Sequence, residues 1–250
     1  MSASYAVAQD NAYVFEGREV TLPVIVRRAR AVAVTFLVDA IAARDLLPTT
    51  GLEIVEVAPR RTLFTLGVID YIDNDLGDYN EVSMAFYVRE TGATRGIPYL
   101  GAWMDFLRGR LSTYIHRLPV DQTFTCAAGR EIWGFPKTVE HIDFATSGDV
   151  AECRLEMDGR FVLALEASAG GSRTLPDNAM LTYSMIDGRL HRTPFRSGAD
   201  GVGIKRGGAQ VALGDHPVAD ELRRLGLPKP ALFSVWMDHM RGRFDAAVQV

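Results

Sequence analysis

The chain has 250 residues, a net charge of −4 at neutral pH, 48% hydrophobic residues and 23% charged residues. This length allows one domain or two closely merged ones, and the composition is that of an ordinary soluble globule. The acidic balance provides no basic field for nucleic acid or anionic lipid. No apolar run approaches the roughly 18 residues that a membrane-spanning helix needs.

Two observations favour a cytoplasmic protein. Residues 1–11 lack the charged start and apolar block of a signal peptide. Cys126 and Cys153 are the only cysteines and have no metal-like spacing, so reduced thiols and no bound metal are expected. We predict a loose arm over residues 1–12 and a single domain over residues 13–250, without linker or repeat.

Runs of β-branched and apolar residues predict that most elements of the first half are strands. These runs are Val20–Val26, Ala31–Val38, Leu52–Ala58, Thr62–Ile72, Glu81–Glu90 and Leu111–Leu118. Asp39 is placed to cap a helix over Ala40–Leu47, which Pro48 would end. The acidic stretch Asp70–Asp78 is predicted to be a loop, and it lacks the ligand pattern of a calcium-binding loop.

The predicted strand Glu81–Glu90 has two unlike faces. One face carries only large apolar side chains, at positions 82, 84, 86 and 88, and Glu81 begins the other face. In a barrel either face could line the interior, so the alternation alone does not decide the role of Glu81.

The middle of the chain is predicted to hold one further helix, and a second segment there is open between helix and irregular structure. Ile97–Leu107 has apolar spacing that suits a helix or an irregular cover. Asp121 is predicted to cap a second helix that runs to about Ala128, where Gly129 would end it. A turn and a strand over Thr138–Ala145 would follow.

The second half of the chain is predicted to consist mainly of hairpins. Asp158-Gly159 and Asp187-Gly188 are strong two-residue turn signals between alternating segments. A helix near Val218–Leu225, a flexible loop at Gly201–Gly208 and a last strand at Ala231–Met240 complete the prediction. About ten strands with few helices indicate an α+β protein, mostly antiparallel, built on a barrel or a strongly curved sheet.

One lysine stands out for its surroundings. The chain has 27 basic residues, of which only Lys137, Lys205 and Lys229 are lysines. Lys137 follows Trp133 and Phe135, whereas the other two lie in Gly-rich or Pro-flanked segments that we expect to be solvated. Burial readily shifts the pKa of a lysine, so an amine among aromatic rings can become a neutral nucleophile. A surface lysine that snorkels over Phe135 is the alternative.

Two segments resemble the acetoacetate decarboxylase family. Gly-Arg-Glu-Ile-Trp-Gly-Phe-Pro-Lys, residues 129–137, resembles the segment that carries the family's Schiff-base lysine. Leu-Gly-Asp-Tyr-Asn-Glu, residues 76–81, resembles the segment that carries its glutamate. The likeness extends from about Val20 to the C-terminus. It implies a cone-shaped β-barrel, a homo-oligomer, a keto-acid substrate and no cofactor, with Lys137 as nucleophile and Glu81 as proton carrier.

Amine catalysis sets a physical requirement on Lys137. An amine attacks a ketone only when it is neutral, and an ordinary lysine has a pKa of about 10.4. Lowering that pKa to about 7 requires roughly 4–5 kcal/mol of selective destabilisation of the ammonium. Burial or a second cation can provide it. Acetoacetate decarboxylase is itself the standard example of a lysine activated in this way, so the mechanism is implied by the resemblance. We expect Trp133 and Phe135 to desolvate the amine.

The sequence also departs from the family pattern. Thr138 stands where the decarboxylases carry a second lysine, and Leu66 stands where a second acid is expected. The position of the family's carboxylate-binding arginine falls on Ala29, although Arg28 or Arg30 could replace it. Tyr79 matches a pocket tyrosine of related aldolase-dehydratases.

Three interpretations therefore remain open. The first is a decarboxylase of a β-keto acid such as acetoacetate. The second is an aldolase-dehydratase that condenses pyruvate with an aldehyde, or another imine-dependent carbon–carbon lyase of secondary metabolism. The third is a binding module or a non-Schiff-base enzyme on the same barrel. Thr138 and Leu66 count against the first, a narrow pocket beside Trp133 against the second, and the intact Lys137 against the third.

Overall fold

The structure, a computed structural model, describes residues 12–47, 51–93 and 97–250. Within these ranges it contains seventeen strands and four short helices. The strands are β1 (Ala12–Phe15), β2 (Arg18–Thr21), β3 (Val24–Asp39), β4 (Leu52–Ile54), β5 (Glu56–Ala58), β6 (Arg61–Asn74), β7 (Tyr79–Glu90), β8 (Ser112–Val120), β9 (Lys137–Val139), β10 (His141–Ser147), β11 (Val150–Met157), β12 (Arg160–Ser168), β13 (Arg173–Ile186), β14 (Arg189–Arg206), β15 (Ala209–Leu213), β16 (Phe233–Phe244) and β17 (Val248–Gln249). The helices are α1 (Ala40–Arg44), α2 (Leu100–Leu107), α3 (Thr123–Trp133) and α4 (Pro217–Arg224).

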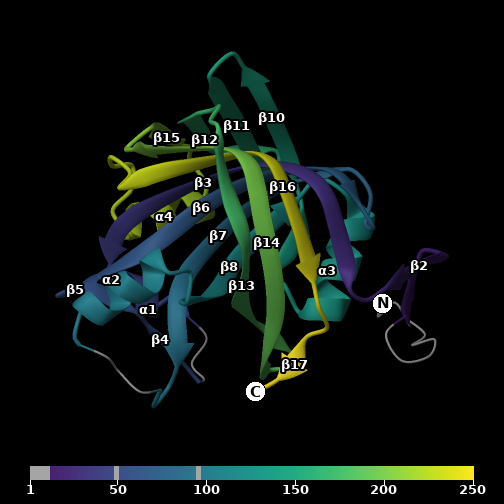
Figure 1. The fold of residues 1–250 in the computed structure, drawn as a ribbon, viewed down its shortest axis with the longest axis horizontal. Helices are drawn as coiled ribbons and strands as arrows, with labels where there is room; N and C mark the ends of the chain where they lie inside the picture. Colours follow the sequence, from purple (N-terminus) through teal and green to yellow (C-terminus); the bar gives the residue numbers. More distant parts are fainter. Residues whose placement is uncertain (1–11, 48–50, 94–96) are drawn as a thin grey trace.

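Seven long strands close into a barrel (Figure 1). Their order around the ring is β3, β6, β7, β8, β13, β14 and β16, with β16 pairing back onto β3. Neighbours are antiparallel except β8 and β13, which run parallel over a short contact. This arrangement confirms the prediction of a mostly antiparallel α+β barrel with few short helices.

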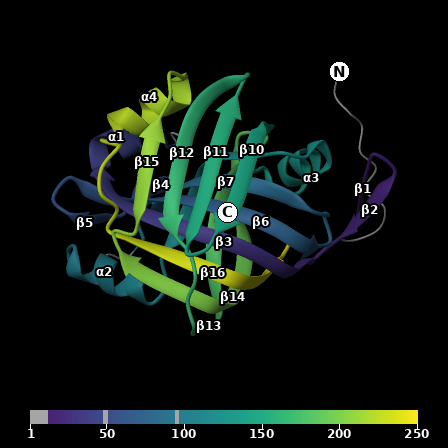
Figure 2. The ribbon, with the colours of Figure 1, turned by 90° about the horizontal axis from the view of Figure 1, so that it is seen from above.

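A second sheet covers one outer face of the barrel. It has the order β10-β11-β12-β15, and Figure 2 shows its strands crossing those of β3, β6 and β16. Its side chains form one buried cluster with α4 and with Val82, Met84 and Phe86 of β7. Because this cluster lies outside the ring, the opposite face of β7 lines the lumen. Glu81 is on that lumen face.

The two ends of the lumen are covered by different helices (Figures 1 and 2). At one end Phe106 of α2 packs edge-on against Tyr87, with ring centroids 5.1 Å apart. At the other end α3 belongs to a buried cluster that includes lumen residues of β3 and β6. The hairpin of β1 and β2 lies beside α3, where Phe15 meets Phe124. None of the helices in the described ranges is long and apolar enough to span a membrane.

The N-terminal third differs from the prediction at the arginine cluster. We expected two strands separated by Arg27–Arg30, but β3 passes through them without interruption. Register shifts on both sides of Arg28 mark an irregularity in the pairing of β3 with β6, and these shifts cancel between Val26 and Ala29. Pro23 instead separates β2 from β3, since it cannot donate to a strand ladder. The predicted arm lies outside the described residues except for Ala12, which begins β1, so the division into arm and domain stays a prediction.

The first predicted helix has the predicted N-cap but is one turn shorter than predicted. Asp39 caps α1 as predicted, since it accepts hydrogen bonds from the backbone N–H groups of Ile41 and Ala42 at 2.8 and 3.1 Å. The helix ends at Arg44 rather than at Leu47, and the proposed stop at position 48 lies outside the described residues.

The helix that precedes the lysine is longer than predicted. Asp121 is not its cap, because both of its carboxylate oxygens accept hydrogen bonds from Asn80 at 2.9 Å. Gln122 holds the cap position instead, and α3 continues through Gly129 to Trp133. Gly134 ends the helix with a φ of +63°, a left-handed conformation that glycine adopts without a Cβ penalty.

Other observed element boundaries also differ from the predicted ones. The two predicted hairpin turns are confirmed, but the run Leu52–Ala58 is divided into β4 and β5, and Thr138–Ala145 into β9 and β10. Strand β6 extends to Asn74, so only residues 75–78 form the predicted acidic loop. The predicted loop at Gly201–Gly208 is wrong, because β14 extends to Arg206. A Cβ on Gly203 would meet the carbonyl oxygen of Gly170 at 2.0 Å, so this glycine serves a close backbone approach.

Candidate active site

Lys137 and Glu81 form a buried ion pair at the α3 end of the lumen. The Lys137 Nζ lies 2.8 Å from the Glu81 Oε2, and the two residues are 4% and 6% exposed. Strand β9 pairs in parallel with β8 and β7 pairs antiparallel with β8, so a short three-strand segment holds both groups. A lone charge at this depth would be costly, and each group supplies the counter-charge of the other.

Two tyrosines surround the ion pair. The Tyr71 hydroxyl donates to the Glu81 Oε1 at 3.3 Å, and its ring stacks on Tyr79 with centroids 4.4 Å apart. The Lys137 Nζ lies 4.9 Å from the centroid of the Tyr79 ring. Burial, reinforced by neighbouring negative charge, raises the pKa of both tyrosines well above the usual value, so both hydroxyls stay protonated.

Tyr71 was not identified from the sequence. A signal for it exists, because strands β6 and β7 are joined by a short turn and pair with Tyr71 directly opposite Tyr79. A predicted hairpin register across residues 75–78 would have placed Tyr71 on the face of Glu81.

Gly129 explains why α3 can pack on the lysine. A Cβ on Gly129 would lie 2.5 Å from the Lys137 Cδ and 2.6 Å from its Cε. A glycine inside a helix costs about 1 kcal/mol relative to alanine. Because Gly129 has no Cβ, the surface of α3 can pack directly against the methylene groups of Lys137.

The two aromatic residues before the lysine have different surroundings. Trp133 is buried, and its Nε1–H donates to the carbonyl of Asp245 at 2.8 Å, which ties the end of α3 to the chain after β16. Phe135 stacks on Trp133 at 5.9 Å between centroids and lines a pocket beside Lys137. Trp133 therefore positions the segment, and Phe135 contributes to the pocket wall.

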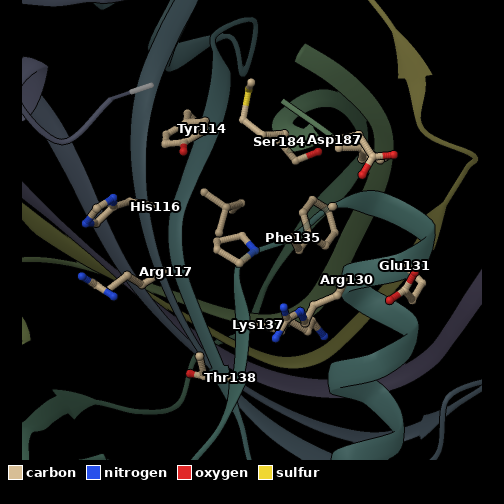
Figure 3. A pocket seen from close by; sticks show the side chains of 15 residues that line it. Tyr114, His116, Arg117, Arg130, Glu131, Phe135, Lys137, Thr138, Ser184 and Asp187 are labelled. Atoms are coloured by element: carbon tan, nitrogen blue, oxygen red, sulfur yellow. The ribbon is translucent and has the colours of Figure 1, made fainter. Parts of the chain in front are cut away.

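A pocket of about 550 Å³ opens where β8 changes partners (Figure 3). Strand β8 pairs with β13 at Thr113 and Tyr114, and with β9 from Leu118 onward. Between these two strand pairings, side chains form the wall of the barrel. The pocket is lined by Tyr114, Ile115, His116, Arg117, Arg130, Glu131, Gly134, Phe135, Pro136, Lys137, Thr138, Ser184, Met185, Ile186 and Asp187.

Thr138 lies on the opposite side of β9 from Lys137 (Figure 3). It is exposed while Lys137 is buried, as expected for successive residues of a strand. Thr138 lines the pocket without facing the ion pair. A cation at this position would project away from the amine.

The structure does not bring Arg28 or Arg30 to the pocket. Arg28 is exposed on β3, and Arg30 extends toward Asp238, with Nε and Oδ1 3.6 Å apart. Ala29 belongs to the buried lumen cluster instead. Leu66 lies in the cluster on the outer face, paired with Met84, so it is not on the face of Glu81.

Glu221 of α4 connects the pocket wall to the second layer. It accepts hydrogen bonds from Arg117 at 2.8 and 2.6 Å and lies 3.0 Å from the Nε2 of His116. Partial burial would raise the pKa of Glu221, but the hydrogen bonds from His116 and Arg117 lower it to about 2. This cluster fastens β8 to α4 at the point where the pocket opens.

Lysine and carboxylate groups account for the chemistry that the site can perform. In the part of the chain that the structure describes, no group of three or more histidine, cysteine, aspartate or glutamate side chains is arranged to hold a metal ion. Lys137, which lines the pocket, is paired in the lumen with the carboxylate of Glu81, which can accept its proton and which itself accepts a hydrogen bond from Tyr71; Glu81 and Tyr71 do not line the pocket. Such a set suits reactions of a carbonyl group with an amine.

The fold and this site define a β-barrel protein with a small-molecule pocket built around a buried lysine. The model of the acetoacetate decarboxylase family matches residues 11–242. The chain therefore belongs to the acetoacetate decarboxylase family, and it is an acetoacetate decarboxylase-like enzyme.

Solved structures share the fold at low sequence identity. An acetoacetate decarboxylase from Legionella pneumophila has 17% identity and a TM-score of 0.64, over 91% of this chain and 87% of that one. The enduracididine biosynthesis enzyme MppR, complexed with pyruvate, has 16% identity and a TM-score of 0.59, over 91% and 90%. An acetoacetate decarboxylase-like enzyme from Sphingomonas wittichii has 14% identity and a TM-score of 0.59, over 97% and 100%. No curated protein sequence matches the chain.

Proposed function

We propose that the chain is an imine-forming carbon–carbon lyase acting on a small keto acid, and that it decarboxylates a β-keto acid. One observation supports this most directly. The amine of Lys137 and the carboxylate of Glu81 lie 2.8 Å apart, buried, beside a pocket large enough for a small molecule. Membership of the acetoacetate decarboxylase family agrees with it.

The ion pair supplies the first step of the reaction. The Lys137 ammonium passes a proton to Glu81, which leaves a neutral amine and a neutral carboxylic acid in the lumen. The amine then attacks the ketone carbon, and the carbonyl oxygen leaves as water while a protonated carbon–nitrogen double bond forms. Tyr71 holds Glu81 in place through its hydrogen bond to Oε1.

The imine then accepts electrons from the bond that breaks. When CO2 leaves, the electron pair of its carbon–carbon bond moves toward the imine nitrogen and forms an enamine. Glu81 gives up its proton as the carbonyl oxygen leaves as water, takes up a new proton from solvent, and delivers this proton to the enamine carbon, directly or through one water. Hydrolysis of the imine releases the ketone and restores the amine.

Condensation with an aldehyde is the second candidate reaction. The same enamine can attack an aldehyde carbon instead of taking up a proton. Two features favour this candidate, the lack of a cation at Ala29 and Thr138 and the similarity of the fold to MppR, which has been seen with the condensation product of pyruvate and imidazole 4-carboxaldehyde. Tyr79, beside the amine, would serve either reaction.

Borohydride trapping tests the imine. Pyruvate or acetoacetate with borohydride is expected to add one reduced adduct per chain, located on Lys137 by peptide mapping. Lys137→Arg keeps a positive charge but offers no neutral amine, so labelling and activity should disappear while the chain still folds. Activity of Lys137→Arg on the true substrate would contradict the proposal and favour a binding module or a non-Schiff-base enzyme.

Lys229 provides the demanding control. We expected it to be solvated, but it is partly buried, its Nζ donates to the carbonyl of Leu37 at 2.8 Å, and burial together with the charge of Arg61 lowers its pKa. Lys205 is exposed. Labelling should survive Lys229→Arg unchanged, because Lys229 lies outside the pocket.

Measuring CO2 release and aldehyde consumption with the same enzyme separates decarboxylation from condensation with an aldehyde.

Self-association and a cytoplasmic location belong to the same proposal. Leu100, Met104 and Leu107 recur at three- and four-residue spacing along α2 and are exposed, as is Ile97 just before the helix, and this arrangement suits a helix–helix contact. Cys126 and Cys153 are free and buried, as in a reducing compartment. Light scattering after size exclusion should report an oligomer, and Leu100→Glu with Leu107→Glu should dissociate it if α2 forms the contact.

A further inference from the structure

Arg130 occupies a distinctive place beside the amine. It lies on the last turn of α3, next to Gly129, which packs against the Lys137 side chain. Arg130 and Lys137 both line the pocket, and Figure 3 shows the Arg130 side chain directed toward Lys137. Burial raises the pKa of the Cys126 thiol, and the positive charges of Arg130 and Lys137 both act against that rise.

Arg130 is also available to bind an anion. Arg117, the other arginine of the pocket, is engaged by both carboxylate oxygens of Glu221. Across the described residues, Arg130 forms no ion pair with a carboxylate, and its side chain is exposed at the pocket. A guanidinium binds a carboxylate with two parallel hydrogen bonds. Arg28 and Arg30 lie elsewhere, so Arg130 is the cation best placed to meet a carboxylate near Lys137.

The pocket is larger than acetoacetate or pyruvate requires, and part of its wall is apolar. Its volume of about 550 Å³ is in the range that holds drug-sized ligands. Ile115, Phe135, Pro136, Met185 and Ile186 contribute apolar surface to its wall. Only Lys137 and Arg130 are needed for the ketone and the carboxylate, which leaves this surface for another substituent.

We infer that Arg130 binds the carboxylate of the substrate, and that the substrate is a keto acid with a bulky apolar group on the other side of its ketone. This inference rests on the imine chemistry proposed above. Arg130 holds the carboxylate at the mouth while the ketone carbon meets the Lys137 Nζ. The apolar group lies along Phe135 and the β13 residues Met185 and Ile186.

Matched pairs of an acid and a ketone test the role of Arg130. Pyruvate is compared with acetone, and 2-oxo-4-phenylbutanoate with 4-phenylbutan-2-one, in which a methyl group replaces the carboxylate. Lys137 adds to the ketone carbon with loss of water, borohydride delivers a hydride to the imine carbon, and the secondary amine is counted by intact mass. The ligand concentration for half-maximal labelling is the readout.

Three variants accompany the wild type. For Arg130→Gln, that concentration should rise roughly ten- to hundredfold for both acids, the loss of a charge-assisted hydrogen-bond pair, and stay unchanged for both ketones. Arg130→Lys keeps the positive charge but cannot form two parallel hydrogen bonds to a carboxylate. Its half-maximal concentrations for the acids should lie between those of the wild type and of Arg130→Gln. Arg154→Gln removes a positive charge from the exposed second sheet, where Arg154 pairs with Glu156, and should behave as the wild type.

The possible results separate the inference from the function on which it rests. Equal effects of Arg130→Gln on acids and ketones, or no effect, would overturn the role of Arg130 while the imine chemistry stands. Wild-type labelling at lower concentration with pyruvate than with 2-oxo-4-phenylbutanoate would overturn the bulky apolar substrate. Absence of any adduct on wild-type Lys137 would overturn the imine chemistry and this inference with it.

Discussion

The two ends of the barrel lumen are built by the same strands and carry different chemistry. Beside α3, strands β6 and β7 present Tyr71 and Glu81, and β9 adds Lys137. Beside α2, neutral hydroxyls replace the charges. Thr35 lies 3.0 Å from Thr65, Thr65 lies 3.2 Å from the Tyr87 hydroxyl, and Thr113 lies 3.2 Å from Thr182, oxygen to oxygen.

The difference shows how a barrel can accommodate polar groups inside. The hydroxyls near α2 bond to one another across neighbouring strands and need no outside partner. The charged end borders the pocket, and its amine and carboxylate can exchange a proton. We propose that the α2 end stabilises the barrel and that the α3 end carries the reaction.

The largest expected contrast between the two ends is in turnover. Glu81→Gln removes the group that protonates the enamine, so turnover should fall by about 10²–10⁴. Loss of the counter-charge favours the neutral amine of buried Lys137, so borohydride should still trap an imine. Thr65→Val, at the other end, should leave turnover within about twofold. Steady-state rates and intact mass on the same samples check both. Unchanged turnover of Glu81→Gln would remove Glu81 from the mechanism.

The ion pair should also dominate stability at its end of the lumen. Glu81→Leu leaves a buried lysine without a counter-charge and should cost about 3–5 kcal/mol of unfolding free energy at pH 7. The double variant with Lys137→Met should recover much of that loss, because no unpaired charge remains. Urea unfolding of the wild type, both single variants and the double variant measures the coupling. Additive losses would show that the two groups do not stabilise each other.

The Glu221 cluster predicts a dependence on acid. The pKa of the Glu221 carboxyl is lowered from 4.5 to about 2, so the ionised carboxylate stabilises the fold above pH 4.5. This contribution is lost as the pH falls toward about 2. Glu221→Gln should therefore cost about 2 kcal/mol at pH 6, an amount discounted for partial exposure, and the difference from the wild type should narrow below pH 4.5. Unfolding free energies measured from pH 6 downward test this, and a constant difference would contradict it.

The smallest expected effect is a gain. Thr193, paired with Thr182 on the neighbouring strand, is fully buried, and its hydroxyl is the one buried side-chain polar atom of the described residues that has no hydrogen-bond partner. Thr193→Val should stabilise by about 1 kcal/mol, since an unsatisfied buried hydroxyl costs more than a methyl group. Thr182→Val, which loses its bond to Thr113, should destabilise by about 1 kcal/mol. Thermal unfolding of the two variants should show shifts of opposite sign.

Local patterns in the sequence were sufficient for several parts of the protein. The segments around Lys137 and Glu81 predicted the family, and strand alternation placed Glu81 opposite the apolar face of β7. Both two-residue hairpin turns and the cap at Asp39 followed from residue types that such turns and caps require. These features depend on residues close together in the chain, where propensity and alternation act directly.

Only the tertiary structure decided which residues surround the lysine. Tyr71 reaches Glu81 through strand register, and Gly129 lies inside α3 because the Lys137 side chain fills the space of its Cβ. The pairing of β3 with β6 is irregular between Val26 and Ala29, and at this point Ala29 enters the buried lumen cluster while Arg30 meets Asp238. Sequence alone could not settle these points, because a one-residue change of register exchanges the two faces of a strand, and register here depends on pairing between distant segments.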